Sequence, residues 1–149
     1  MRLSTKGRYG IKAMLDLAIH NSEGYITLKS IAQRQEISEN YLEQLFASLK
    51  KADLVKSTRG SHGGYILAKS PNDITVGSIL RALEGSLAPV ACVDEDVQEK
   101  CTRSDTCVAK IIWEKIRDSV NDAVDSITIG SILEEYDNNS KSSDCLDYI

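Results

Sequence analysis

The fold is decided by residues 28–65, which read LKSIAQRQEISENYLEQLFASLKKADLVKSTRGSHGGY. Thr27 and Ser38 can each cap a short helix, and a turn at Glu36-Ile37 separates the two helices. The second helix carries apolar residues at helical spacing, which predicts one buried stripe: Tyr41, Leu42, Leu45, Phe46 and Leu49. Two short helices in this order predict a helix-turn-helix, the arrangement that presents its second helix to DNA.

The remaining side of the second helix is polar. Its outward-facing residues are Glu39, Asn40, Glu43, Gln44 and Lys51. A helix with a buried stripe on one side and hydrogen-bonding side chains on the other suits a recognition helix, whose polar groups read base edges in the major groove. DNA is therefore the first candidate partner of this chain.

A β-hairpin is predicted directly after the second helix. Residues 54–58 and 65–68 have the apolar patterns of two strands, and the glycine-rich segment from Arg59 to Gly64 joins them. The glycines permit positive φ angles and let the backbone approach a surface closely. Arg59 would then lie at the tip of a wing, suited to a narrow minor groove. An ordinary solvated hairpin is the competing interpretation.

The N-terminal segment predicts a further helix. Ser4 or Thr5 can cap it, and it runs to about His20. Its start carries positive charges, which the helix dipole disfavours there: Arg2, Lys6, Arg8 and Lys12. Basic side chains in this position suggest contacts with DNA phosphates, although exposed lysines usually have no specific role.

The charge of the chain is divided between its two halves. The net charge is −4 and the isoelectric point is about 5.2, values that argue against a DNA-binding protein. Residues 1–70, however, hold 11 Lys and Arg against 6 Asp and Glu, whereas residues 71–149 hold 7 against 16. A basic half that reads DNA and an acidic half that senses or assembles would explain this asymmetry. A solvated imbalance without function is the alternative.

Length and hydrophobicity restrict the size and location of the protein. With 149 residues, 42% of them hydrophobic, the chain can bury one core, so we expect one domain with an appended element. No apolar run approaches the ~18 residues of a membrane span, and the N-terminal residues lack the apolar stretch of a secretory signal. We therefore expect a cytoplasmic protein with no membrane partner.

The second half begins with a turn at residues 70–73 and a helix that Thr75 can cap and Gly85 can end. The start of this helix, ITVGSIL at residues 74–80, recurs almost unchanged as ITIGSIL at residues 127–133. Two copies are too few for a repeat architecture, which needs at least about three units. The recurrence indicates one capped helix start that is used twice.

A long helix is predicted from Val108 onward. Apolar residues recur along it and form a ridge: Ile112, Ile116, Val120, Val124 and Ile127. A helix of about twenty residues is roughly 30 Å long, and so long a ridge on a small chain favours pairing with a second copy. A homodimer would present two recognition helices to two half-sites. Packing of the ridge on the chain's own core is the competing interpretation.

The segment between the two predicted helices contains cysteines. Residues 85–107 show no periodicity and hold Cys92, Cys101 and Cys107, whose spacing differs from the close Cys-x2-Cys pairs of zinc ribbons and fingers. Three thiolates in an irregular loop suit an iron–sulfur cluster, because its irons take soft sulfur ligands. Structural thiols without a metal, a redox switch and a zinc site are the alternatives.

Catalysis has little support in the sequence. Only two histidines are present, His20 and His62, and neither has a nucleophile nearby in the sequence. The chain contains no nucleophile elbow, phosphate loop or paired carboxylate pattern above background. We expect a protein that is not an enzyme, and an enzyme of unrecognised type is the least favoured alternative.

The chain resembles the Rrf-type winged-helix transcription regulators. The likeness rests on RLSTKGRYGIKAMLDLA at the N-terminus, on the helix-turn-helix and wing quoted above, and on ITVGSILRALEG after them. The resemblance implies a homodimeric regulator, usually a repressor, whose dimerisation helices cross at about residues 108–127. The DNA-reading positions that it implies are Asn40, Tyr41, Glu43 and Gln44, with Arg59 in the wing.

Within this family, the cysteine triad resembles that of the iron–sulfur branch. The resemblance implies that the three cysteines hold a two-iron, two-sulfur (2Fe-2S) cluster. The fourth ligand departs from the family pattern, because Lys110 stands where this branch has a histidine and Arg8 where nitric-oxide sensors have an acidic ligand. Cys145, an acidic side chain or a small thiol could complete the site.

The chain also resembles a cluster-free branch of cysteine-metabolism repressors. The shared features are the segments LKSIAQ and LVKSTRGSHGGY and the chain end Asp147-Tyr148-Ile149. The resemblance implies that such a tail docks in the active site of cysteine synthase. Tyr148 and Ile149 are therefore candidate partner-binding residues, and an apolar tail end without a partner is the alternative.

Together these expectations describe a mainly α-helical chain with a small β-hairpin wing, in which a winged helix-turn-helix is joined to a long dimerisation helix. We expect residues 1–84 to bind DNA, residues 85–107 to form a sensor loop, residues 108–136 to form the dimerisation helix and a short helix, and residues 137–149 to form a flexible tail. The expected function is regulation of genes for iron–sulfur cluster biogenesis or for cysteine and sulfur metabolism, by repression.

Overall fold

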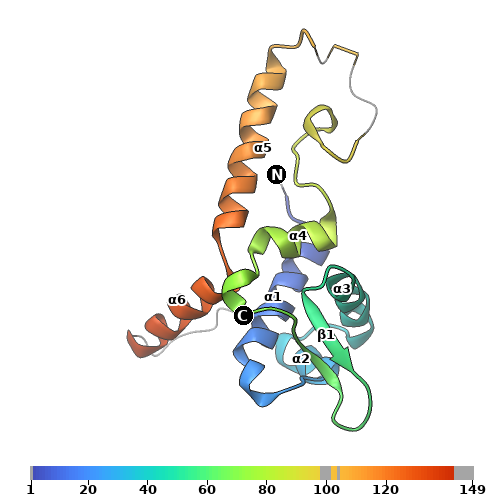
Figure 1. Cartoon of the computed structure of the whole chain (residues 1–149), viewed down its shortest axis with the longest axis vertical. Coiled ribbons are helices and arrows are strands. Elements are labelled where there is room, and N and C mark those ends of the chain that lie inside the picture. Colours follow the sequence, from blue (N-terminus) through green and yellow to red (C-terminus); the bar gives the residue numbers. More distant parts are fainter. Residues whose placement is uncertain (1, 98–101, 104, 143–149) are drawn as a thin grey trace.

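The computed structural model of the chain describes residues 2–97, 102–103 and 105–142. Six α-helices and one antiparallel hairpin make up this part of the chain: α1 (Thr5–Ile19), α2 (Leu28–Gln35), α3 (Glu39–Lys51), β1 (Val55–Thr58), β2 (Gly64–Leu67), α4 (Val76–Glu84), α5 (Ala109–Ser126) and α6 (Ile129–Ser142). Helices α1 to α4 and the hairpin form a compact body, and α5 extends away from it (Figure 1). The mainly helical architecture with one hairpin is confirmed.

Four helices begin where the sequence predicts their caps. The side chains of Ser4, Thr27, Ser38 and Thr75 each accept a hydrogen bond from the backbone N–H three residues later, at 3.0–3.4 Å. Each cap satisfies one of the N–H groups that the first turn of a helix leaves without a partner. After α2 the chain turns at Glu36, whose φ of 55° is left-handed without a glycine.

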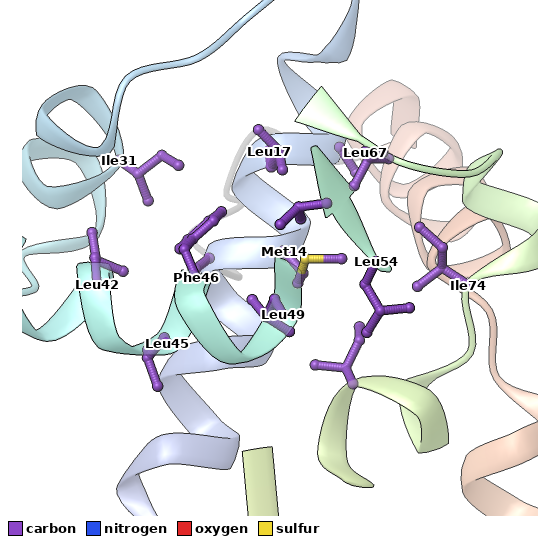
Figure 2. Packing of buried hydrophobic residues seen from close by; sticks show 14 of the residues in the cluster. Met14, Leu17, Ile31, Leu42, Leu45, Phe46, Leu49, Leu54, Leu67 and Ile74 are labelled. Carbon is purple, nitrogen blue, oxygen red and sulfur yellow. The ribbon is translucent and has the colours of Figure 1, made fainter. Parts of the chain in front are cut away.

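The hydrophobic core lies between α1, α3 and the hairpin. Met14 and Leu17 of α1 and Phe46 and Leu49 of α3 are fully buried and point toward one another (Figure 2). The predicted stripe of α3 faces this core, except that Tyr41 at the edge of the stripe is only half-buried. Burying one stripe of α3 fixes which of its side chains remain exposed to a partner.

The hairpin is tied to the helix-turn-helix by a third segment. Strands β1 and β2 pair from Val55 with Leu67 to Thr58 with Gly64. The N–H of Ile26 donates to the Tyr65 carbonyl at 2.9 Å, and the N–H of Tyr65 donates to the Ile26 carbonyl at 2.8 Å. The segment before α2 therefore extends the sheet by one bridge and holds the hairpin against the body.

The two copies of the recurring heptapeptide contact each other. Thr75 and Thr128 form an isolated antiparallel bridge, in which the N–H of Val76 donates to the Ile127 carbonyl at 2.8 Å. The same relation holds in reverse, because the N–H of Ile129 donates to the Ile74 carbonyl at 2.9 Å. The recurring sequence thus supplies two capped helix starts that pair with approximate two-fold symmetry.

The glycine of each copy makes room for a side chain that precedes the other copy. A Cβ on Gly77 would collide with the Asp125 carboxylate, and a Cβ on Gly130 would collide with the Asn72 side chain. Asp125 and Asn72 each precede the first isoleucine of a heptapeptide by two residues, so the two close approaches are equivalent. Sequence reasoning recognised the repeated cap but not this contact between the copies.

The last helix is longer than expected. α6 continues to Ser142, although we expected a flexible tail to begin at Asp137. Thr128 caps α6 by accepting a hydrogen bond from the Ser131 N–H at 3.0 Å, and Ile132, Leu133 and Tyr136 are half-buried. A helix that is started and packed in this way can extend over polar residues, because propagation costs far less than nucleation.

Candidate nucleic-acid interface and sensor loop

The exposed face of α3 carries the predicted base-reading residues. Asn40, Glu43 and Gln44 are exposed, while Leu42 and Phe46 anchor the opposite face in the core. Spacings of three and four residues place Asn40 beside Glu43 and Gln44 on the helix surface. The structure therefore presents three amide or carboxylate side chains together on one exposed face.

Tyr41 was predicted both in the buried stripe of α3 and as a DNA contact, and it packs against a tyrosine of α1 that sequence reasoning did not predict as its partner. Its ring meets the ring of Tyr9 edge-on, with centroids 5.9 Å apart and planes at 88°. The charged ends of Arg8 and Lys12 lie 5.9 Å and 5.8 Å from the centroid of the Tyr9 ring. The ring contact thus joins α1 to the start of α3, and cation–π attraction within α1 keeps two of its basic side chains beside that contact.

The start of α1 shares a cavity with α3. Arg2 and Lys6 are exposed, and together with Tyr41 they line a cavity of about 630 Å³. The first residues after α4, at positions 86–88, line the same cavity. Two predicted phosphate-binding side chains, one just before α1 and one in its first turn, are therefore brought together with a predicted DNA-contacting side chain of α3.

Arg59 lies apart from this cavity, in the turn of the hairpin, and is exposed. Gly60 has a φ of 106°, and the N–H of Gly63 donates to the Gly60 carbonyl at 3.0 Å. A Cβ on Gly63 would lie 2.5 Å from the Thr58 carbonyl oxygen. The glycines thus permit the tight turn of the hairpin (Figure 1), in which Arg59 is exposed.

A buried ion pair fixes the angle between α1 and α2. The Asp16 side chain is 2% exposed and accepts hydrogen bonds from Arg34 Nη2 at 2.7 Å, Arg34 Nε at 3.0 Å and Gln35 Nε2 at 2.9 Å. The hydrogen bond to Asp16 raises the pKa of Arg34 above its usual value. Sequence reasoning missed this contact, although a carboxylate between the apolar residues Met14 and Leu17 was the available signal.

The predicted sensor loop is described only in part. Cys92 is half-buried in a short 3-10 turn, Ala91–Val93, and Cys107 is exposed just before α5; both are free thiols. Cys101 lies outside the described residues. In the part of the chain that the structure describes, no three His, Cys, Asp or Glu side chains gather closely enough to hold a metal ion.

The cavity around Cys107 contains candidate side chains for the fourth ligand of the predicted cluster. Cys107, Asp105 and Glu114 line a cavity of about 440 Å³ together with Lys110. Nζ of Lys110 lies 3.9 Å from Oε1 of Glu114, so the lysine at the position of the family histidine is part of an ion pair. A lysine ammonium has no lone pair for a metal, which leaves the Cys107 thiol and the two carboxylates of this cavity as the chemically suitable donors.

Hydrogen bonds connect α5 to the predicted sensor loop and to α4. Nη1 of Arg117 donates to the Val93 carbonyl at 3.2 Å, and Val93 itself is 3% exposed. At the base of α5, Arg81 Nη1 donates to Asp125 at 2.7 Å and Arg81 Nη2 donates to Asn121 at 2.9 Å. The hydrogen bond from Arg81 holds the pKa of Asp125 below its ordinary value.

Two further expectations concern the termini and membranes. Tyr148 and Ile149, the predicted partner-binding residues, lie outside the described part of the chain, as does Cys145. Among the helices that the structure describes, none is both long enough and apolar enough to cross a bilayer.

Comparison with known proteins identifies the family. Residues 3–135 match the model of the Rrf2 family, which is described as an iron-dependent transcriptional regulator. The chain belongs to the Rrf2 family. The matched region contains the helix-turn-helix, the wing, the cysteine loop and α5. Membership of this family implies DNA binding rather than catalysis.

The relatives include regulators named CymR and regulators named IscR. The chain is 43% identical to the transcriptional regulator CymR of Bacillus subtilis over 92% of this chain and 93% of that protein, and 42% identical to IscR of Pectobacterium carotovorum over 99% and 85%. The solved structure of IscR from T. potens, 46% identical, has a TM-score of 0.74 and covers 99% of this chain and 95% of its own. That of CymR, the global cysteine regulator of B. subtilis, has a TM-score of 0.73 and covers 91% and 98%. The winged-helix fold expected from the sequence is thereby confirmed.

Proposed function

We propose that this Rrf2-family regulator binds double-stranded DNA with α3 in the major groove, Arg59 in an adjacent minor groove, and Arg2 and Lys6 on phosphates. The observation that carries the proposal is the exposed polar face of α3, held beside the basic start of α1. Polar side chains on a rigid helix provide base readout, and flanking cations provide the phosphate contacts that set its register. In this proposal residues 1–84 form the DNA-binding unit.

The proposal includes a homodimer formed through residues 108–136. No side chain of α5 is fully buried within the chain, and the first part of its apolar ridge is open to solvent, with Ile112 55% exposed and Ile116 40%. Ile111, which flanks the ridge, is also 55% exposed. A cavity of about 320 Å³ lies along this ridge, lined by Ile112, Ile116 and Val120 among others. Pairing of two α5 helices would remove this apolar surface from water and set the distance between two α3 helices.

We further propose that residues 85–107 sense iron–sulfur status. Cys92, Cys101 and Cys107 would hold a 2Fe-2S cluster, and the soft donor character of their thiolates fits that group. When bound, the cluster supplies a redox-active and oxidant-sensitive centre. The chain itself ties this loop to α5 through the bond from Arg117 to the Val93 carbonyl and leaves the Cys107 thiol exposed. The regulator would act in the cytoplasm as a repressor of genes for cluster biogenesis or sulfur metabolism.

A second candidate function is repression of cysteine metabolism without a cluster. It is favoured by the 43% identity to CymR, the global cysteine regulator of B. subtilis. In this case cysteine synthase would control the repressor by binding Tyr148 and Ile149 at the end of residues 137–149. Removal of these two residues would then abolish binding to cysteine synthase and leave DNA binding intact.

One measurement separates the two functions. Protein purified without oxygen is analysed for iron, sulfide and visible absorption, beside a variant with Cys92→Ala, Cys101→Ala and Cys107→Ala. Iron and visible bands in the wild type that vanish in the variant support the cluster sensor. Colourless, iron-free protein that still binds DNA contradicts the cluster and supports the second function.

The wing is tested by Arg59→Ala. We expect this variant to bind DNA more weakly by about 1–3 kcal/mol at fixed salt if Arg59 makes a specific contact. Binding is measured with duplexes that the wild-type protein selects from a random DNA library. Lys69→Ala is the control, because it removes one exposed positive charge outside the hairpin turn. Equal affinities of Arg59→Ala and wild type would contradict the wing assignment.

A further inference from the structure

The last residue of α4 contacts the first turn of α1. The backbone N–H of Ser4 donates to Oε1 of Glu84 at 2.6 Å, and the Ser4 hydroxyl donates to the same oxygen. A Cβ on Gly7 would lie 2.8 Å from this oxygen, so only a glycine lets the carboxylate sit so close to the helix. Glu84 therefore lies directly over the start of α1, although 80 residues separate it from Ser4.

The position of Glu84 is unfavourable for its own helix. A negative charge at the C-terminus of α4 faces the negative end of the helix dipole, whereas the same charge at the N-terminus of α1 is stabilised. The Ser4 hydroxyl also accepts a hydrogen bond from the Gly7 N–H at 3.4 Å. Glu84 thus completes a cap in which its carboxylate satisfies the Ser4 N–H, the role that a glutamate within the same helix has in a capping box.

Glu84 also adjoins the predicted sensor loop. Gly85, with a φ of 80°, ends α4, and the following residues, 86–88, line the cavity that Arg2 and Lys6 line. Leu87 is 7% exposed, so this first part of the loop is packed against the body. A displacement of the loop would therefore act on Glu84 through one intervening residue.

We propose that Glu84 is a positioning residue that couples the sensor loop to the phosphate-binding start of α1. This inference rests on the proposed sensor function of residues 85–107 and names the residue through which the state of these residues would change DNA binding. In one state the carboxylate caps α1 and keeps its first turn, which carries Lys6 and follows Arg2, in place for phosphate. In the other state the end of α4 moves, the cap is lost and the first turn of α1 frays. The two states differ by defined contacts, as coupling between two sites requires.

The coupling is tested with Glu84→Ala and Glu84→Gln, and with Glu134→Gln on α6 as a control that removes an exposed carboxylate elsewhere. Affinity for library-selected duplexes is measured for protein loaded with iron and sulfide and for protein stripped with a chelator. We expect Glu84→Ala to weaken DNA binding of the tighter-binding form about tenfold, because a charge-assisted cap is lost. Glu84→Gln, which keeps an acceptor, should lie between it and the wild type.

The decisive readout is the ratio of the DNA affinity of the loaded protein to that of the stripped protein. A residue that only stabilises α1 would lower both affinities equally, whereas a coupling residue makes the ratio fall toward one when it is removed. Amide hydrogen exchange at Gly7 and Arg8, measured in whichever form binds DNA more tightly, gives a second readout that involves no DNA, and we expect it to be faster in Glu84→Ala than in Glu134→Gln.

Two results would overturn the inference. The first is that Glu84→Ala has the same ratio of loaded to stripped affinity as the wild type and the same hydrogen exchange at Gly7 and Arg8. This result would overturn the coupling alone and leave the sensor function in place. A wild type whose affinity does not depend on the state of the loop would overturn the sensor function and the coupling together.

Discussion

Asp16 is the buried charge on which the placement of α2 depends. In Arg34→Met its carboxylate, 2% exposed, loses a bidentate partner and keeps the hydrogen bond from Gln35 and the His20 imidazole, whose Nδ1 lies 3.6 Å away. We expect the free energy of unfolding to fall by about 2–3 kcal/mol, less than for a fully buried pair because the Arg34 side chain is 35% exposed. Urea denaturation of wild type and variant measures this change.

The control for this prediction is Lys29→Met. Lys29 lies on the same helix and is exposed, so its replacement should change stability by no more than about 0.5 kcal/mol. If both variants unfold at the same urea concentration, the Asp16 pair does not stabilise the placement of α2.

Asp125 gives a stability that depends on pH. The hydrogen bond from Arg81 lowers its pKa in the folded protein, so the unfolded chain binds a proton first as the pH falls. The stabilisation is therefore fully present above the ordinary aspartate pKa of about 4 and is lost as the pH falls through the lower, folded-state pKa. We expect Asp125→Asn to be less stable than wild type at pH 7 and this difference to shrink at pH 3.

Thermal unfolding at the two pH values measures this difference. Asp125 is 47% exposed, so we expect a small effect. Asp122→Asn, an exposed carboxylate on the same helix, is the control. A stability difference between Asp125→Asn and wild type that is as large at pH 3 as at pH 7 would mean that the ion pair is not its source.

Residue-scale contacts divide into those that sequence reasoning could predict and those that it could not. The caps at Thr27, Ser38 and Thr75 were predictable, because each hydrogen bond spans three residues of one helix. The bond from Arg34 to Asp16 spans 18 residues and depends on how two helices pack, which no local pattern encodes. The role of Glu84 had one local signal, because an acidic residue at the C-terminus of a helix is disfavoured by the helix dipole.

At the scale of elements, the wing depends on one glycine. Gly64 has a φ of 151°, and a Cβ there would collide with the backbone carbonyl of Ile26, which a neighbouring side chain cannot relieve by moving. Gly60 also has a positive φ, 106°, but nothing lies within 4 Å of its Cβ position. Both alanine substitutions strain the backbone, and only Gly64→Ala separates the hairpin from the segment before α2.

We therefore expect Gly64→Ala to destabilise the protein by at least about 2 kcal/mol and Gly60→Ala by about 1 kcal/mol. Urea denaturation measures both variants, and loss of DNA affinity should follow the same order. Equal destabilisation would show that the bridge between Ile26 and Tyr65 does not hold the wing.

Elements were predictable where local signals were strong. The helices that carry caps and the glycine-rich hairpin follow from local signals, whereas the end of α6 does not, because polar residues beyond Tyr136 give no sign of where a packed helix stops. The pairing of residues 74–80 with 127–133 was also missed. Similarity of two segments shows that each can form the same structure, and says nothing about whether they touch.

At the scale of the whole molecule, the exposed ridge of α5 predicts the oligomeric state. Ile112→Glu places a charge in the proposed interface, where it would be buried without a partner. We expect the variant to be monomeric at micromolar concentration while its circular dichroism stays that of a folded protein. Sedimentation velocity measures the mass, and DNA affinity should fall because two half-sites are no longer bound together.

Asp118→Ala is the matched control, because it changes the charge of α5 at an exposed position away from the ridge. It should sediment as the wild type does. A wild type that is itself monomeric, or an Ile112→Glu variant that remains dimeric, would contradict a dimer through this face. Sequence reasoning predicted the ridge from its spacing, but its exposure of 40–55% at Ile112 and Ile116 required the fold.

The bridge between Thr75 and Thr128 has a topological consequence. Because the two residues lie side by side, residues 76–127 form a segment whose two ends meet at one point, although its first helix, α4, is packed on α1 within the body. Doubling the length of a flexible closed segment costs only about 0.6 kcal/mol. If residues 85–107 sense a signal as proposed, evolution can therefore lengthen, shorten or exchange them while the winged helix-turn-helix keeps its sequence, so that one scaffold can respond to several different signals.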